Sequence, residues 1–266
     1  RRPPISTLFP YTTLFRSPTD WPGKIPPVQW VYGEMVRKLA PGEIVHLLVD
    51  SPAQEKLARR ILQRAGASLD RVEFHQWATN RGWMRDSGPI FVRRGGNKPE
   101  TAVVHFHFNA WAKYPDWQHD RLVPEHAAKL FGKRLFNAQF KGRDFVIEGG
   151  GIDVNGRGTL LTTEECLLDQ QTQVRNPGLS QKEVETVLKS DLGVTNILWL
   201  GNGVAGDDTH GHVDDICRFV NPTTVVLVQE RNSQDVNYRP LCENRERLEG
   251  MRLENGSKIQ DRKSVV

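Results

Sequence analysis

The densest run of polar side chains in the sequence is GDDTHGHVDD, which extends from Gly206 to Asp215. It follows a glycine-rich stretch and leads into a predicted strand, in which alternate side chains share a face. His212 and Asp214 are therefore expected to project together. A histidine beside a carboxylate can carry a proton near neutral pH, so this pair is a candidate general acid and base. A solvated polar loop is the alternative interpretation.

Two further carboxylates stand next to turns. Asp86 lies in WMRDSGP, and Glu148 ends the apolar run VIE before three glycines, where backbone can approach a ligand closely. Taken alone, Asp86 could form a surface ion pair with Arg85, and Glu148 could be an acid beside a tight turn. With Asp214, these acids would give one site an excess of negative charge.

A site with that charge favours a cationic ligand. A planar guanidinium offers five N–H donors in a fixed fork and pairs with carboxylates through two parallel hydrogen bonds. Trp83 and Trp111 could add cation–π contacts, although a tryptophan is by default a core residue. The residues therefore predict a site for a small guanidine compound.

A metal site is a second interpretation of the same run. His210, His212, Asp207 and Asp214 all offer ligand atoms. The run lacks the helical pair of histidines four residues apart, and the cysteine partners, of familiar zinc sites. A metal-binding hydrolase is therefore kept only as an alternative.

The elements that must position these residues recur at a regular interval. Helices are predicted to begin near residues 51, 120, 180 and 240, with Ser51 and Ser180 as N-terminal caps. An order of strand, strand, helix, strand every 60 residues or so indicates repeats around an axis, and a doubly wound sheet is the alternative. The predicted strands are 43–49, 71–75, 90–93, 102–108, 145–148, 159–162, 196–200, 213–220 and 223–228.

The charge of the chain is concentrated at its ends. The 266 residues are 38% hydrophobic and 26% charged, which is typical of a soluble globular protein, and the formal net charge is +4. Residues 1–17 contain Arg1, Arg2 and Arg16 and no acid, and the terminal DRKSVV adds one further positive charge. The remaining core is formally neutral, which argues against a nucleic-acid partner.

Both ends are expected to be non-native sequence. Residues 1–17, RRPPISTLFPYTTLFRS, show no helical or strand periodicity and resemble a translated sequencing-adapter read-through; residues 261–266 resemble the matching adapter. A natural basic arm is the alternative. We expect residues 18–260 to form one partial domain.

The cysteines and the hydropathy indicate a compartment. Cys166, Cys217 and Cys242 are odd in number and widely spaced, which argues against a disulfide scaffold or a zinc knuckle and favours the reducing cytoplasm. No apolar stretch approaches the ~20 residues of a membrane span, so no membrane partner is expected.

Several separated blocks together resemble one family. The segments TDWPGK, WMRDSGP, FNAWAKY, VIEGGGIDVNGRGTLLTTEECLL, RNP, ILWL and GDDTHGHVDD are similar to those of agmatine deiminase and the bacterial peptidyl-arginine deiminases. The resemblance covers residues 18–260. It implies an α/β fold of the pentein type, a five-bladed propeller of ββαβ units, truncated here to about three to four blades. TDWPGK favours agmatine over a peptidyl-arginine or another guanidine.

The resemblance also implies residue roles. Asp86 and Asp214 would bind the guanidinium nitrogens, His212 would act as general acid and base, and Glu148 would orient His212. Asp208, Trp83 and Trp111 would be further substrate-binding residues. The product from agmatine would be N-carbamoylputrescine, formed without a metal or organic cofactor. Relatives often form dimers, so a homodimer is also considered.

One part of the family's pattern is missing. A cysteine thiolate attacks the guanidinium carbon in this family, from a glycine-rich block ending in His-Cys, and the sequence contains no such block. Cys166 and Cys217 are predicted to be small buried residues. We therefore expect this chain to be an inactive fragment of a deiminase, with a natural guanidine-binding protein without catalysis as the alternative.

Overall fold

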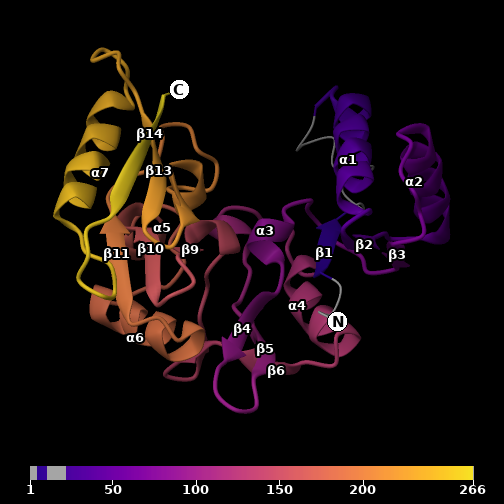
Figure 1. Ribbon diagram of the computed structural model, residues 1–266, viewed down its shortest axis with the longest axis horizontal. Helices are drawn as coiled ribbons and strands as arrows, with labels where there is room; N and C mark the ends of the chain where they lie inside the picture. The colour runs from indigo at the N-terminus through magenta and orange to yellow at the C-terminus, as the bar shows by residue number, and fades with distance from the viewer. Residues whose placement is uncertain (1–4, 11–21, 266) are drawn as a thin grey trace. The chain divides into compact units, whose positions relative to one another are not determined.

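The computed structural model describes residues 5–10 and 22–265 and divides into two compact units (Figure 1). The first unit comprises Arg1–Gly88 and Asp116–His126, and the second comprises Pro89–Pro115 and Ala127–Val266. Among the described residues, no helix is long and apolar enough to cross a membrane.

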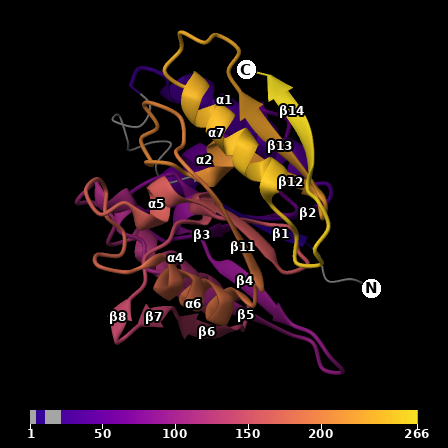
Figure 2. The ribbon, with the colours of Figure 1, turned by 90° about the vertical axis from the view of Figure 1, so that its left-hand side faces the viewer.

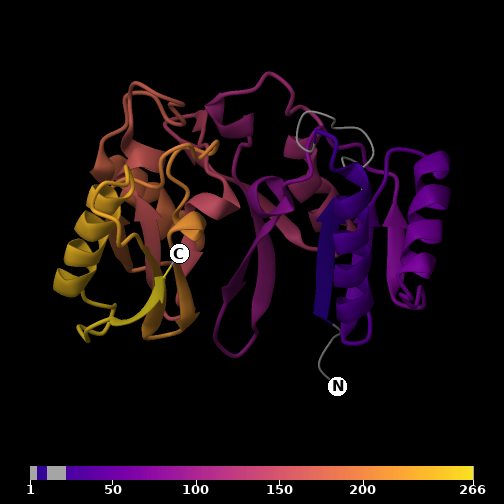
Figure 3. The same cartoon turned by 90° about the horizontal axis from the view of Figure 1, so that it is seen from above.

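The first unit is built on a three-stranded parallel sheet. Its strands are β1 (Ile5–Pro10), β2 (Glu43–Leu48) and β3 (Val72–His75), in that order across the sheet. Helices α1 (Ile25–Leu39) and α2 (Pro52–Arg64) lie beside these strands (Figure 3) and share a core with Val45, Leu47 and Val72. The unit also contains the short helix α3 (Met84–Ser87), a 3-10 turn at Asp120–Leu122 and the first part of α4 (Val123–Leu130).

Helix α2 begins where the sequence predicts it. The Ser51 hydroxyl accepts a hydrogen bond from the backbone N–H of Gln54 at 3.3 Å, and Pro52 occupies the first helical position. Helix α1 was not among the predicted helices. The sequence does contain a helix-start pattern here, because Pro26 and Pro27 stand in the first turn, where the backbone N–H groups have no intrahelical partner.

The second unit repeats one topology in three separate sheets (Figure 2). In each sheet the first two strands are antiparallel, and the strand after the helix pairs in parallel with the second. This is the predicted order of strand, strand, helix, strand, and the separate sheets contradict a doubly wound sheet. The prediction is wrong for the helix near residue 51, because the strands of the first unit are all parallel and α1 separates β1 from β2. The elements are β4 (Ile90–Arg94), β5 (Glu100–His105), α4 and β6 (Arg134–Asn137); β9 (Asp153–Val154), β10 (Thr159–Thr163), α6 (Gln181–Leu192) and β11 (Asn196–Leu200); and β12 (Cys217–Asn221), β13 (Thr224–Gln229), α7 (Tyr238–Gly250) and β14 (Gln260–Val265).

Two predicted strands around the site are wrong in part. Residues 145–148 form no strand, and only Val146 makes an isolated bridge, to His107. Val213–Asp215 is a 3-10 turn, and the strand that follows begins at Cys217. Both segments carry site residues. The Asn176 side chain bonds the backbone of Val146, and the Ile216 N–H donates to the carbonyl of Val213 in the turn, so neither segment continues a regular ladder. The remaining elements of the second unit are β7 (Gln139–Phe140), β8 (Arg143–Asp144), α5 (Glu164–Leu168) and 3-10 turns at Ala110–Ala112 and Gly149–Gly151.

Both chain ends contribute strands where we expected no regular structure. β1 pairs with β2 from Ile5 opposite Glu43, and β14 pairs with β13 from Gln260 opposite Thr224. Both are edge strands of their sheets, and a parallel ladder is formed by backbone groups irrespective of the side-chain pattern. Ile5–Pro10 and the segment after Gln260 therefore pair as strands without a strand-like side-chain pattern, and the non-native, adapter-like origin of both ends stays a prediction.

A buried acid in the first unit makes the stability of this unit depend on pH. Asp120 is fully buried and accepts the backbone N–H groups of Asn80 at 2.8 Å and Arg81 at 3.0 Å. Burial outweighs these hydrogen bonds and raises the pKa of Asp120 to about 7. Because the folded chain prefers the protonated carboxyl, the stabilisation is complete below the ordinary pKa of 3.8 and is lost as pH rises through about 7.

Asp120→Asn is therefore expected to remove a pH-dependent part of the stability. Each unit of pKa shift corresponds to about 1.4 kcal/mol, so the variant should gain a few kcal/mol relative to the unmodified chain between pH 4 and pH 8. Thermal unfolding across this range measures the difference, and Asp70→Asn, which removes an exposed acid of the same unit, is the control. An unchanged pH dependence in Asp120→Asn would contradict the assignment.

Candidate active site

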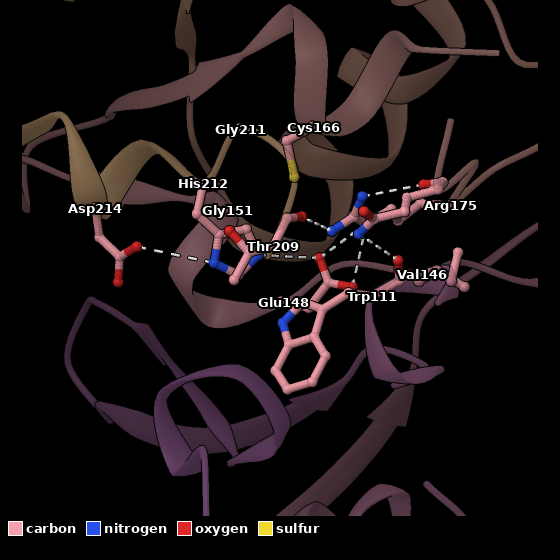
Figure 4. Close-up of polar contacts among 12 residues, drawn as sticks. Trp111, Val146, Glu148, Gly151, Cys166, Arg175, Thr209, Gly211, His212 and Asp214 are labelled. Atoms are coloured by element: carbon pink, nitrogen blue, oxygen red, sulfur yellow. Dashed lines mark hydrogen bonds and ion pairs between the residues drawn. The ribbon is translucent and has the colours of Figure 1, made fainter. Parts of the chain in front are cut away.

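The most deeply buried charged pair of the second unit is Glu148 with Arg175 (Figure 4). Both side chains are 0% exposed, and Arg175 Nε lies 3.3 Å from each oxygen of the Glu148 carboxylate. The other guanidinium nitrogens donate to the backbone carbonyls of Gln173, at 3.0 Å, and Thr209. An ion pair removed from water in this way is stable only when its remaining polar groups are also bonded, as they are here.

Glu148 is positioned by the loop that contains Arg175. Asn176 donates to the carbonyl of Val146 at 2.8 Å and accepts the N–H of Val146 at 2.9 Å, which fixes the backbone two residues before Glu148. Burial alone would raise the pKa of Glu148, but the Arg175 charge and the His212 hydrogen bond outweigh it and hold the pKa below its usual value. Glu148 is therefore an ionised carboxylate inside the protein.

His212 stands between two carboxylates (Figure 4). Its Nε2 lies 3.4 Å from Glu148 Oε2, and its Nδ1 lies 3.8 Å from Asp214 Oδ1. The imidazole is 2% exposed, whereas the side chain of Asp214 is 19% exposed. An imidazole held by a buried anion on one nitrogen and facing a more accessible anion on the other can take up and release a proton while its orientation stays fixed.

Asp207 holds the loop that presents His212. It accepts the N–H of Thr209 at 2.7 Å, of Gly211 at 2.9 Å and of His212 at 3.3 Å. Gly211 has φ +84°, and a Cβ there would lie 2.8 Å from the side chain of Glu165. Only glycine satisfies both conditions, so this position fixes the path of the chain into His212.

The predicted metal-binding set does not assemble. His210 turns to a different pair of acids, with Nε2 2.8 Å from Asp169 and Nδ1 3.6 Å from Glu165. Asp207 bonds the backbone of its own loop. Among the described residues, the potential ligand groups whose atoms lie within 4.8 Å of one another are Glu148 with Cys166 and His212, and His46 with Glu73 and His75.

A strained turn carries Trp111. Ala110, Trp111 and Ala112 all have positive φ, between 51° and 59°, which is costly for residues with a side chain. Asn109 caps the turn by accepting the N–H of Ala112 at 2.8 Å. Gln173 donates to the carbonyl of Trp111 at 3.1 Å, so the turn is tied to the loop that carries Arg175. Strain of this kind persists where the surrounding structure holds a side chain in a particular place.

Asp208 lies beside this turn. Its carboxylate contacts Lys113 Nζ and accepts the Tyr114 hydroxyl at 2.8 Å, and its backbone carbonyl accepts from Gln173 at 3.2 Å. The structure therefore already supplies Asp208 with a cation of the same chain. Its role in binding a substrate stays a prediction.

Three of the predicted site residues lie close together in the structure. Glu148, His212 and Asp214 come together in the second unit, and the predicted proximity of His212 to Asp214 holds although a 3-10 turn replaces the strand. Asp86, which is 9% exposed on α3, and Trp83, which is 43% exposed, belong to the first unit. Their place in the site stays a prediction.

Two residues of the arrangement were missed. Arg175 and Asn176 belong to the RNP block that resembles the family, and the sequence indicated no role for either. An arginine and an asparagine before a proline give no periodic signal, and the partners of Arg175 lie 27 and 34 residues away in sequence. Only the resemblance of RNP to the family could have singled them out.

The three cysteines occupy different surroundings. Cys166 and Cys217 are buried, at 2% and 1% exposure, as predicted. Cys217 stands on β12, where burial raises its pKa, and Cys242 stands on α7. Cys166, on α5, is the one nearest the site: a Cβ on Gly151 would lie 3.1 Å from its Sγ and 3.9 Å from the His212 ring.

Residues 7–263 match the Porphyromonas-type peptidyl-arginine deiminase family. The chain belongs to this family. It is 36% identical over 248 residues to an agmatine deiminase of Ectopseudomonas mendocina, covering 91% of this chain and 63% of that protein, and 35% identical over 231 residues to an agmatine deiminase of Pseudomonas fluorescens, covering 85% and 58%.

The mixed α/β fold is also that of solved deiminases. The agmatine deiminase of Enterococcus faecalis superposes with a TM-score of 0.83 at 28% identity, over 99% of this chain and 68% of that one. A cysteine-to-serine variant of the agmatine deiminase of C. jejuni with substrate bound superposes with a TM-score of 0.78 at 28% identity, over 98% and 71%. The chain thus spans about three fifths of the length of the curated relatives, and the number of propeller blades stays a prediction.

Proposed function

We propose that this chain carries the guanidinium-binding and proton-transferring part of an agmatine deiminase. The observation that supports this most strongly is the His212 ring held between buried Glu148 and accessible Asp214. The matched relatives are named agmatine deiminases, and the family is one of guanidine-modifying hydrolases. Agmatine, a small guanidine with an amine at its other end, is the proposed ligand.

Each of the gathered side chains has a proposed role. Asp214 pairs with guanidinium N–H groups, because a carboxylate accepts two parallel bonds from that planar fork. His212 transfers protons to and from the leaving nitrogen, and Glu148 holds its ring in place. Arg175 is a positioning residue, since it acts through Glu148. We propose that Asp86 supplies a second carboxylate to the same guanidinium.

The complete reaction needs a thiolate. In a complete deiminase, the thiolate attacks the guanidinium carbon, ammonia leaves with a proton from the histidine, and water cleaves the thiouronium intermediate to release N-carbamoylputrescine. Cys217 and Cys242 lie on β12 and α7, and Cys166 is buried next to Gly151, with its Sγ within 4.8 Å of ligand atoms of Glu148 and His212. We propose that none of them attacks the substrate, so these 266 residues bind agmatine without turning it over.

Calorimetric titration and product analysis of the same sample test this proposal. We expect agmatine to bind, putrescine, which lacks the guanidinium, to bind at least about tenfold more weakly, and neither ammonia nor N-carbamoylputrescine to form. A peptide with an internal arginine tests the alternative substrate class. Ammonia release that disappears in Cys166→Ser would overturn the assignment of Cys166, and equal binding of putrescine and agmatine would overturn the guanidinium site.

A further inference from the structure

Three potential metal ligands converge in the first unit, apart from the site described above. His46 Nδ1 lies 2.9 Å from His75 Nε2 and 3.3 Å from Glu73 Oε2, and His75 Nε2 lies 3.9 Å from the same carboxylate oxygen. All three side chains therefore direct one ligand atom at a common point. None of the three residues belongs to the site formed by Glu148, His212 and Asp214 in the second unit.

The sheet pattern places the three side chains together. Val45, Leu47 and Phe74 pack into the core shared with α1 and α2, so their neighbours in sequence lie on the opposite face. His46 on β2 is in register with Glu73 on β3, and Leu48 is in register with His75. In parallel strands, residues in register share a face, so Glu73 is the lateral neighbour of His46 and His75 is its diagonal neighbour.

The separations fit a tetrahedral ion. Bonds of about 2.0–2.1 Å to nitrogen and oxygen, at tetrahedral angles, place neighbouring ligand atoms roughly 3.3 Å apart. The three observed distances, 2.9, 3.3 and 3.9 Å, lie on both sides of that value. Two histidines and one glutamate are a ligand set that zinc enzymes use, with the fourth position left to water or substrate.

The neighbouring side chains pack against the histidine rings, and the cluster is accessible to an ion from solvent. The side chain of His46 is 4% exposed, whereas that of Glu73 is 52% exposed, so an ion can reach the cluster from the Glu73 side. The His75 ring packs against Trp77 at 4.9 Å between centroids, and Trp77 in turn stacks on His126 at 5.1 Å.

We propose that His46, Glu73 and His75 bind a divalent transition-metal ion of the zinc type. His46 would bind through Nδ1, His75 through Nε2 and Glu73 through one carboxylate oxygen. This site is distinct from the proposed guanidine site, so either assignment can fail without the other. The competing account is a hydrogen bond between the two neutral imidazoles, which requires no ion.

A zinc titration of the full chain distinguishes the two accounts. Protein stripped with EDTA is titrated with Zn²⁺ against a chromophoric chelator, together with Glu73→Gln and His75→Ala. We expect one zinc to bind, and its affinity to fall at least about tenfold in each variant, because even outer-shell partners of metal ligands contribute that much. The exposed His119, in the same unit, provides the matched control His119→Ala.

Two further measurements keep the result interpretable. Cobalt substitution should give d–d bands without a thiolate charge-transfer band, and Cys166→Ser should leave the affinity unchanged, because Glu148, Cys166 and His212 form the other cluster of potential ligands. Glu73→Gln alters a half-exposed side chain and decides the outcome if His75→Ala does not fold. Zinc affinity that is unchanged in Glu73→Gln, or is lost in Cys166→Ser, would overturn the proposal.

Discussion

Arg175→Met is expected to destabilise the second unit by about 3–5 kcal/mol, which is the usual cost of removing one partner of a buried ion pair. The variant leaves the Glu148 carboxylate fully buried without its cation, and the carbonyls of Gln173 and Thr209 lose their donors. Urea denaturation monitored by tryptophan fluorescence measures the change in the free energy of unfolding.

Two controls show whether burial is the cause. Arg94→Met removes an arginine that pairs with Glu100 at 2.7 Å but is 77% exposed, and it should cost about 1 kcal/mol or less. The double variant Glu148→Gln with Arg175→Met should recover part of the loss, because the uncompensated charge is gone. A loss of under 1 kcal/mol in Arg175→Met would show that the pair is not buried as described.

Asp214→Asn is expected to weaken agmatine binding by about 10- to 100-fold. A hydrogen bond to a charged group contributes roughly 1.5–3 kcal/mol, and each 1.4 kcal/mol corresponds to a factor of ten. The amide keeps the shape of the carboxylate and loses its charge. Calorimetric titration of the variant with agmatine measures the ratio of dissociation constants.

The neighbouring acid provides the matched control. Asp215 stands in the same 3-10 turn, and among the described residues it forms no ion pair with His212 and acts on it only at longer range, so Asp215→Asn should change the affinity by less than about threefold. Equal losses in the two variants would indicate a general effect of negative charge. An unchanged affinity in Asp214→Asn would exclude Asp214 from the guanidinium site.

The repeat and the identity of several site residues could be predicted from the sequence. The helix beginnings depend on local caps, and β10, β11 and α6 carry clear apolar patterns, so these elements lie close to their predicted bounds. His212 and Asp214 were found because polar residues gather there in sequence. The three sheets of the second unit confirm that the interval of about 60 residues is structural.

The rest depended on contacts between distant segments. Arg175 reaches Glu148 and Thr209 across loops with no periodic pattern, and Asn176 fixes the backbone of Val146 from 30 residues away. The cluster of His46, Glu73 and His75 could not be predicted from the sequence, because its residues lie on adjacent strands whose register is known only from the fold. The edge strands β1 and β14 are held by backbone hydrogen bonds to the neighbouring strand. The side-chain pattern of the sequence does not indicate such pairing.

The central claim is that His212 stands at a guanidinium site, and ¹⁵N NMR of the histidine rings during an agmatine titration tests it directly. The His212 resonances are assigned by their absence in His212→Gln. The account predicts that both ring nitrogens of His212 shift and saturate with the calorimetric dissociation constant, while those of exposed His119 stay in place. Agmatine binding that leaves the His212 resonances unmoved would contradict it.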